Sequence, residues 1–195
     1  MRRVNGMLVG MTAAAVLLAA ADVRAAEYNE FVDGDLSNVA SAPTFWPLET
    51  GPNVLVANSG SVDFDVVRIA VPERQVLESI TIEFHGEHLR VFGGIQAGGA
   101  WTAGLGASVD VMQTLGWMDF PTDPEAMHDG EDILFGMSLS NAGFFPPLAS
   151  GDYTLLFQTS GTAISYALDF NVRPQGDFDF DFDVDNSDLA VWVDS

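Results

Sequence analysis

The chain has 195 residues, and it contains no cysteine and no lysine. The absence of cysteine excludes disulfides, thiolate metal ligands and thiol catalysis, so hydrophobic packing has to hold the fold. The few cations are all arginines, and 28 acidic residues give a formal net charge of −21 at pH 7. Such a surface repels nucleic acid, because proteins bind nucleic acid mainly through cations on phosphates.

Sequence signatures of catalysis are missing as well. The chain has no Gly-x-Ser-x-Gly nucleophile elbow, no phosphate-binding loop and no dinucleotide-binding fingerprint. Acidic residues are so abundant that a glycosidase-like pair of carboxylates cannot be recognised without geometry. We therefore expect a protein that is not an enzyme, with a secreted hydrolase as the less favoured alternative.

Long apolar runs are absent except near the start of the chain. The uncharged stretch Met7–Ala21 follows Arg2 and Arg3, and Val23-Arg24-Ala25 has small residues at the −3 and −1 positions. This order predicts a cleavable, helical signal peptide over residues 1–25, and its apolar run is shorter than the roughly 20 residues of a membrane span. We expect a secreted or extracytoplasmic protein, at the cell surface or in the periplasm, without a membrane span after cleavage.

Several segments have the apolar–polar alternation of strands. In Val62–Val66 apolar and acidic residues alternate, as in a half-buried strand, and Leu77–Phe84 has a similar period. Tyr153–Gln158 and Ala163–Val172 predict a hairpin joined by residues 159–162. In the second arm every other residue is large and apolar, from Ile164 to Val172.

These segments predict an all-β fold, an antiparallel β-sandwich of jelly-roll-like type over residues 26–174. No stretch between residues 26 and 172 repeats an apolar 3.6-residue period long enough to predict a helix. For the glycine-rich Gly93–Gly130 we favour several short strands over one long functional loop.

Three segments resemble the bacterial pre-peptidase C-terminal domain type. They are the opening Phe31–Asn38, the strand Asp65–Val71 that ends in Val-Pro, and Pro147–Thr154 before a strand. The resemblance implies a small jelly-roll-like sandwich, found as an accessory in secreted bacterial proteins, and it implies no catalytic residues.

The tail, residues 175–195, has the spacing of a calcium loop of EF-hand type. Such a loop needs oxygen ligands at positions 1, 3, 5, 9 and 12 and a backbone carbonyl at position 7. Starting at Asp177, the side-chain positions hold Asp177, Asp179, Asp181, Asp185 and Asp188, and Asp183 supplies the carbonyl. A shift of two residues puts Ala190 at position 12, and a shift of four puts Trp192 there, so one register fits.

This register, with Asn186 and Ser187 leading into a short exit helix, resembles the type I dockerin repeat. The resemblance implies calcium as the cofactor and a cohesin-like protein as a partner. Two features depart from it: Phe180 and Phe182 stand where glycines are usual, and only one repeat is present. A bulky residue forced into the left-handed conformation costs about 1–2 kcal/mol. We expect calcium binding weaker than that of a complete dockerin.

Alternatives remain at this point. The tail could be a solvated acidic strand with alternating Phe, or disordered. Asp33 and Asp35 could bind a second calcium, although Asp33-Gly34 is also a simple turn signal. If Trp46, Trp101 and Trp117 were exposed, they could stack on sugar rings, and the protein would be a carbohydrate-binding module of a polysaccharide-degrading system. Core packing is favoured for each of them. The leading hypothesis is a non-catalytic module for extracellular attachment or interaction with protein or polysaccharide.

The signal peptide gives the first prediction. The mature chain should begin at Ala26 and, with four arginines against 27 acidic residues, have a formal net charge of −23. Mass spectrometry of the exported protein measures this end directly. An intact Met1 on the exported protein would contradict the prediction.

Overall fold

The computed structural model describes residues 25–85, 90–120, 130–141, 143–159, 161–185, 187–188 and 191. The predicted signal peptide, apart from Ala25, lies outside these ranges.

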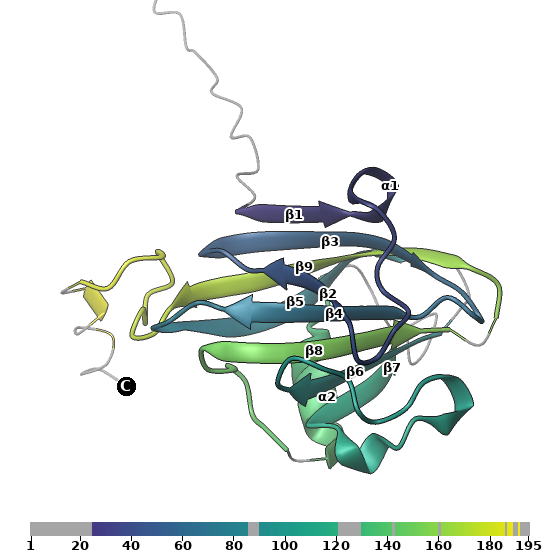
Figure 1. Cartoon of the computed structure of the whole chain (residues 1–195). Helices are drawn as coiled ribbons and strands as arrows, with labels where there is room; N and C mark the ends of the chain where they lie inside the picture. Colours follow the sequence, from purple (N-terminus) through teal and green to yellow (C-terminus); the bar gives the residue numbers. More distant parts are fainter. Residues whose placement is uncertain are drawn as a thin grey trace, which may run out of the picture.

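Two sheets face each other and form a β-sandwich (Figure 1). The four-stranded sheet has the order β1 (Ala26–Asn29), β3 (Gly51–Ser59), β9 (Ile164–Pro174), β5 (Gln75–His85). The five-stranded sheet has the order β2 (Thr44–Pro47), β4 (Asp65–Val71), β8 (Gly151–Gln158), β6 (Val91–Ala97), β7 (Gly116–Phe120). The predicted all-β sandwich is confirmed, and β4 coincides with the segment Asp65–Val71 that carries part of the family resemblance.

The sandwich is not purely antiparallel. β1 pairs with β3 and β2 pairs with β4 in parallel, whereas the other pairings are antiparallel. From β1 to β5 the chain passes from one sheet to the other at every step. Two strands that neighbour each other in one sheet are therefore separated by a strand of the opposite sheet. This crossover allows them to run in the same direction.

The hairpin predicted for the last two strands is wrong. β8 pairs with β4 and β6 in the five-stranded sheet, and β9 pairs with β3 and β5 in the other. The chain between them crosses the sandwich, so the two strands face each other across the core. The rings of Phe157 on β8 and Tyr166 on β9 are 5.4 Å apart. Both strands bury an apolar face in the same core, and the alternation in the sequence fits this arrangement as well as it fits a hairpin.

The core lies between the sheets, and β9 contributes most regularly to it. The face predicted from its alternation is buried throughout: Ile164, Tyr166, Leu168, Phe170 and Val172. The indole of Trp46 on β2 packs edge-on against Phe170, with ring centroids 5.2 Å apart. Burial of these large side chains supplies the hydrophobic stabilisation that a chain without disulfides needs.

A helix that the sequence did not predict closes one side of the core. α2 (Ile133–Asn141) buries Ile133, Leu134 and Met137 and packs against β7 and β5. It begins at Asp132, whose carboxylate accepts hydrogen bonds from the backbone N–H groups of residues 134 and 135. Apolar residues lie almost all round this short helix, so it has no polar face for a 3.6-residue period to reveal. The other helix, α1 (Glu30–Asp33), is a single turn.

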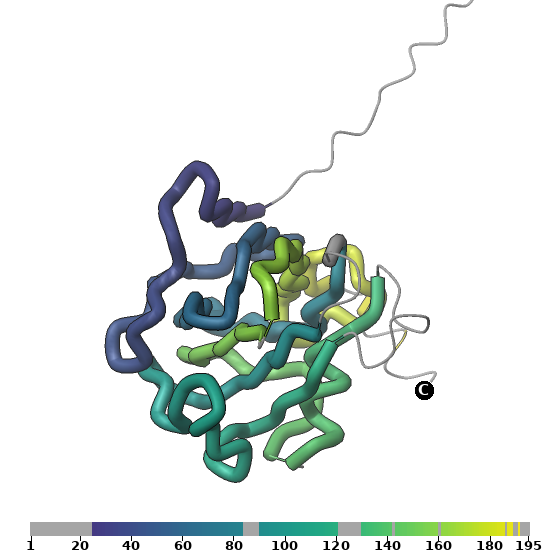
Figure 2. The backbone as a smooth tube through the Cα atoms, turned by 90° about the vertical axis from the view of Figure 1, so that its right-hand side faces the viewer, coloured from purple at the N-terminus to yellow at the C-terminus, as the bar shows by residue number. Residues whose placement is uncertain are grey.

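The glycine-rich segment contains fewer strands than expected. Between β6 and β7 the chain forms the loop 98–115, with 3-10 turns at Gly106–Ser108 and Val111–Gln113. In this loop Trp101 is buried, and its indole N–H donates to the carbonyl of Gly104. The loop covers part of the outer face of the five-stranded sheet and is drawn in teal in Figure 2. Residues 121–129 of the same segment lie outside the described ranges.

The prediction that Val62–Val66 forms a half-buried strand with its acidic residues in solvent is wrong. The strand starts only at Asp65, and this side chain points into the core with 0% exposure, whereas Val62 is 82% exposed. The hydroxyl of Tyr166 donates to Asp65 Oδ2 at 2.6 Å, and Oδ1 has no hydrogen-bond partner in the described part of the chain. Burial raises the pKa of Asp65 from 3.8 to about 9, and the nearby carboxylate of Glu30 adds to the increase.

Asp65 should therefore make stability depend on pH. The folded protein keeps a proton on this carboxyl that the unfolded chain loses above about pH 4, so folding becomes less favourable as pH rises towards the folded-state pKa. The loss approaches about 1.4 kcal/mol per pH unit. Asp65→Asn removes the ionisation and should flatten the decline in unfolding free energy between pH 5 and 9, measured by urea denaturation in chelator. Glu73→Gln, on the surface, serves as the control; equal slopes in all three proteins would contradict this role.

The sandwich should also fold without the tail. Among the described residues, the buried apolar core ends at Val172. Deleting residues 176–195 should therefore leave a single cooperative thermal transition in chelator, with a midpoint lower by no more than a few degrees. Loss of the cooperative transition would mean that the tail belongs to the core.

Candidate metal centre

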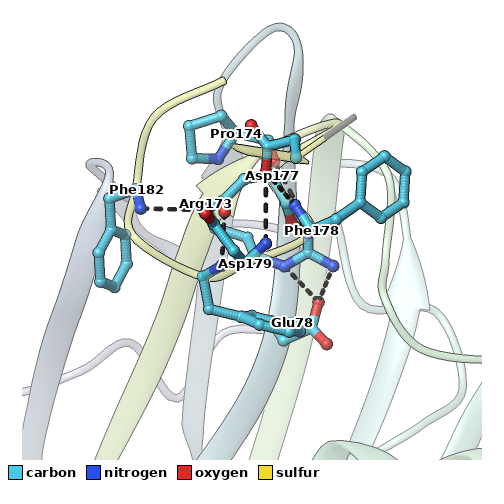
Figure 3. Close-up of polar contacts among 9 residues, drawn as sticks. Glu78, Arg173, Pro174, Asp177, Phe178, Asp179 and Phe182 are labelled. Atoms are coloured by element: carbon cyan, nitrogen blue, oxygen red, sulfur yellow. Dashed lines mark hydrogen bonds and ion pairs between the residues drawn. The ribbon is translucent and has the colours of Figure 1, made fainter. Parts of the chain in front are cut away.

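Arg173, near the end of β9, fixes the start of the tail to the sandwich. Its guanidinium pairs with Glu78 of β5 at 2.8 Å and donates from Nη1 to the carbonyl of Asp177 at 2.7 Å (Figure 3). The same group lies over the ring of Phe180, 5.0 Å from its centroid. One side chain thus holds the first residue of the predicted calcium loop against the edge of the sheet.

Asp177, at position 1 of the loop, organises the turn that follows it. Its side chain is 0% exposed. Oδ1 accepts a hydrogen bond from the N–H of Phe180 at 2.7 Å, and Oδ2 accepts one from Phe182 at 3.0 Å. The carboxylate thereby curls the next five residues around itself.

Phe180 and Phe182 have the backbone conformation that glycine usually adopts. Their φ angles are +64° and +70°, in the left-handed region. Each costs about 1–2 kcal/mol relative to an ordinary conformation. The two bonds to Asp177 compensate part of this strain. The tail therefore makes the turn at which a calcium loop usually has glycines, although phenylalanines occupy these positions.

Asp188, at position 12, closes the loop. Its Oδ1 accepts from the N–H groups of Phe178 and Asp179, and Oδ2 accepts from Asp185 at 2.7 Å. The bond from the N–H of Asp185 is the main reason why the pKa of Asp188 is lowered. Although eleven positions apart in sequence, Asp177 and Asp188 are both buried at the centre of the tail.

The structure brings three of the six predicted ligand residues together. Asp177, Asp179 and Asp188 each offer a carboxylate oxygen, and these oxygens lie within 4.8 Å of one another. Desolvation, followed by the negative charge of Asp181, raises the pKa of the exposed Asp179. The repulsion among three converging carboxylates can be relieved in two ways, by protonation of one of them or by a bound cation.

The other three predicted residues lie outside this cluster. Asp181 accepts from the N–H of Asp183, and Asp185 accepts from the N–H of Ser187, so both carboxylates cap local turns. All three side chains are exposed. Desolvation and the charge of Asp181 raise the pKa of Asp183.

Residues 177–185 form bends and contain no strand, which contradicts the alternative of an acidic strand. Of the predicted exit helix, Ser187, Asp188 and Val191 are described and helical. Asn186, Trp192 and the end of the chain lie outside the described residues.

Asp33 and Asp35 are the candidates for a second calcium site. Among the described residues, neither belongs to a group of three acidic side chains whose oxygens converge. The Asp33 carboxylate accepts from the N–H of Asn29 at 2.8 Å and so caps the turn of α1. The neighbouring Glu30, which the sequence did not single out, has a comparable task. Its carboxylate accepts from the N–H groups of Leu36 and Asn58, and burial raises its pKa.

The tryptophans differ in exposure. Trp46 and Trp101 are 5% and 2% exposed, so their predicted packing role is confirmed. Trp117 on β7 is only half-buried, and its ring stacks against Phe92 of β6 with centroids 6.0 Å apart. Of the three described tryptophans, Trp117 is thus the one with a ring that is accessible to a ligand.

Within the described ranges, no helix has the length and apolar character needed to cross a membrane. No protein-family model and no curated protein sequence matches the chain. Among solved structures, the chain is similar to PliG of Aeromonas hydrophila, a periplasmic lysozyme inhibitor of g-type lysozyme. The identity is 14% and the TM-score is 0.36, over 67% of this chain and 96% of PliG.

Proposed function

We propose that this protein is an extracytoplasmic, non-catalytic β-sandwich module whose Asp-rich tail binds calcium, and that it serves in extracellular attachment or interaction. The observation that supports this most directly is the convergence of Asp177, Asp179 and Asp188. These residues occupy positions 1, 3 and 12 of the one register that fits a calcium loop, and the chain between them turns as such a loop requires.

Calcium suits the ligand set better than other common ions. The ligands are carboxylate and carbonyl oxygens, which exclude the nitrogen and sulfur chemistry of structural zinc. A flexible loop with about seven oxygens fits calcium, whereas magnesium demands a stricter octahedron. The residues that would hold the ion are first the converging Asp177, Asp179 and Asp188. Asp181, Asp185 and the carbonyl of Asp183 would complete the site if the carboxylates of Asp181 and Asp185 turned from the local bonds that they now accept. A bound cation would also neutralise part of the −21 formal charge of the chain.

The described cavities support a role in binding rather than hydrolysis. One cavity is lined by Glu78 beside Phe180 and Phe182, and two others share Asp119. Each thus has a single carboxylate among its described lining residues, whereas glycoside hydrolysis ordinarily needs two across the scissile bond. Asp65, the described carboxyl with the largest increase in pKa, is fully buried beside Tyr166 and cannot reach a substrate.

Two kinds of partner follow from this proposal. The resemblance of the tail to a type I dockerin favours a cohesin-like protein, which would meet the loop at Asn186 and the exposed Ser187. An extracellular polysaccharide is the second, and the half-buried Trp117 favours it.

Calcium binding is testable with terbium, which occupies calcium sites. Terbium in the loop of the full-length mature chain should emit on excitation of nearby aromatic residues and be displaced by calcium, more readily than by magnesium. Asp177→Asn keeps a hydrogen-bond acceptor but removes a charge, and should weaken binding at least tenfold. Phe182→Gly removes left-handed strain and should tighten binding about tenfold, equivalent to about 1.4 kcal/mol.

Glu73→Gln, an exposed acid outside the tail, is the matched control and should bind like the wild type. Absence of terbium emission and of calcium-binding heat in both wild type and Phe182→Gly would sink the calcium proposal.

A further inference from the structure

An aromatic and polar row crosses the outer face of the five-stranded sheet. Phe92 of β6 is paired with Asp119 of β7 on one side and with Gln158 of β8 on the other. Paired residues of neighbouring strands point to the same side of a sheet. Trp117, two residues before Asp119, shares this face and stacks on Phe92 at an interplanar angle of 18°.

The loop 98–115 forms a wall beside this row. The amide of Gln158 accepts from the N–H of Gly106 at 2.9 Å and donates to the carbonyl of the same residue at 3.2 Å. This two-point contact fixes the loop to β8. Gly94 permits close packing at the floor, because a Cβ there would lie 2.8 Å from the ring of Trp101 and 3.1 Å from Phe92.

The space above the row is large enough for a ligand. A cavity of about 630 Å³ over the row is lined by residues including Phe64, Phe92, Gly106 and Gln158. A second cavity, of about 350 Å³, lies at the free edge of β7 between Trp117 and residues of α2 such as Leu139. Arg90 and Asp119 line both cavities. The two cavities therefore adjoin at Arg90 and Asp119, and we call them together the groove. The volume of the larger cavity is in the range of natural ligand sites.

We propose that this groove binds a segment of a neutral extracellular polysaccharide, with the rings of Trp117 and Phe92 against sugar rings and Arg90 and Asp119 at the hydroxyl groups. The inference rests on the proposed function, a non-catalytic binding module, and names its ligand class and site.

The composition of the groove favours this ligand over others. The flat apolar faces of aromatic rings match the C–H faces of pyranose rings, and planar guanidinium and carboxylate groups can each bond two neighbouring hydroxyls. A purely apolar ligand would leave the charged groups Arg90 and Asp119 desolvated without partners. An anionic polymer would meet the carboxylate of Asp119 and the net charge of −21, both repulsive.

Calorimetric titration of the mature chain with cellohexaose, xylohexaose and mannohexaose tests the proposal, supported by electrophoresis through gels that contain the corresponding soluble polysaccharides. We expect at least one of these probes to bind and to change the tryptophan fluorescence. Trp117→Ala should weaken that binding at least tenfold, and Asp119→Asn should weaken it severalfold. Phe31→Ala, which removes a ring that is 69% exposed outside the groove, should have no effect.

The proposal is overturned if no probe binds the wild-type chain, or if both groove variants bind as the wild type does. Should Trp117→Ala fail to fold, Asp119→Asn together with the fluorescence change decides the question. Binding should persist in chelator and in Asp177→Asn, since the groove shares no described residue with the metal loop. Failure of the groove and failure of the calcium site therefore give different results.

Discussion

The strand β9 lies between two other strands of its sheet and connects the core to the tail. It pairs with both β3 and β5, buries every second side chain in the core, and carries near its end Arg173, which holds the tail. Without disulfides, the position of the metal loop relative to the sandwich depends on the register of this strand. A slip of one residue would turn Arg173 away from Glu78 and move the buried face of β9 into solvent. The Asp-rich loop of the tail is thus placed mainly by the strand that forms the centre of the hydrophobic core, together with the bond from the N–H of Gln175 to the carbonyl of Arg74.

The sequence allowed the apolar faces to be predicted, but not how the strands meet. A period of two identifies which side of β9 is buried, because burial of one face is a local consequence of the pleat. The same period is compatible with pairing beside β8 or packing across from it, and the structure has the second. α2 escaped prediction because its exposed side also carries apolar residues, Phe135 and Leu139, so no polar face marks a helical period. Asp65 escaped prediction because acidic side chains normally face solvent.

The candidate metal centre could be predicted further than the groove. Spacing alone set its register, because the ligands of a loop are close together in sequence, and it singled out Phe180 and Phe182 as the positions of backbone strain. It did not show that Asp181 and Asp185 cap local turns. The groove could not be foreseen, since Phe92, Trp117 and Gln158 come from separate strands that only the tertiary fold brings together.

Charge connects these features. Arg68 pairs with Asp152 on neighbouring strands, and Arg173 pairs with Glu78 where the tail begins, so these cations join specific segments rather than neutralising the surface. Most carboxylates then have to be satisfied by backbone N–H groups, by water or by added cations. Where backbone groups suffice, as at Asp33 and Glu30, the acids stabilise turns. Where several carboxylates converge, as in the tail, backbone hydrogen bonds lower the pKa of Asp188, whereas desolvation and the neighbouring charges raise the pKa of Asp179. The proposed calcium ion would relieve the repulsion that remains at Asp179.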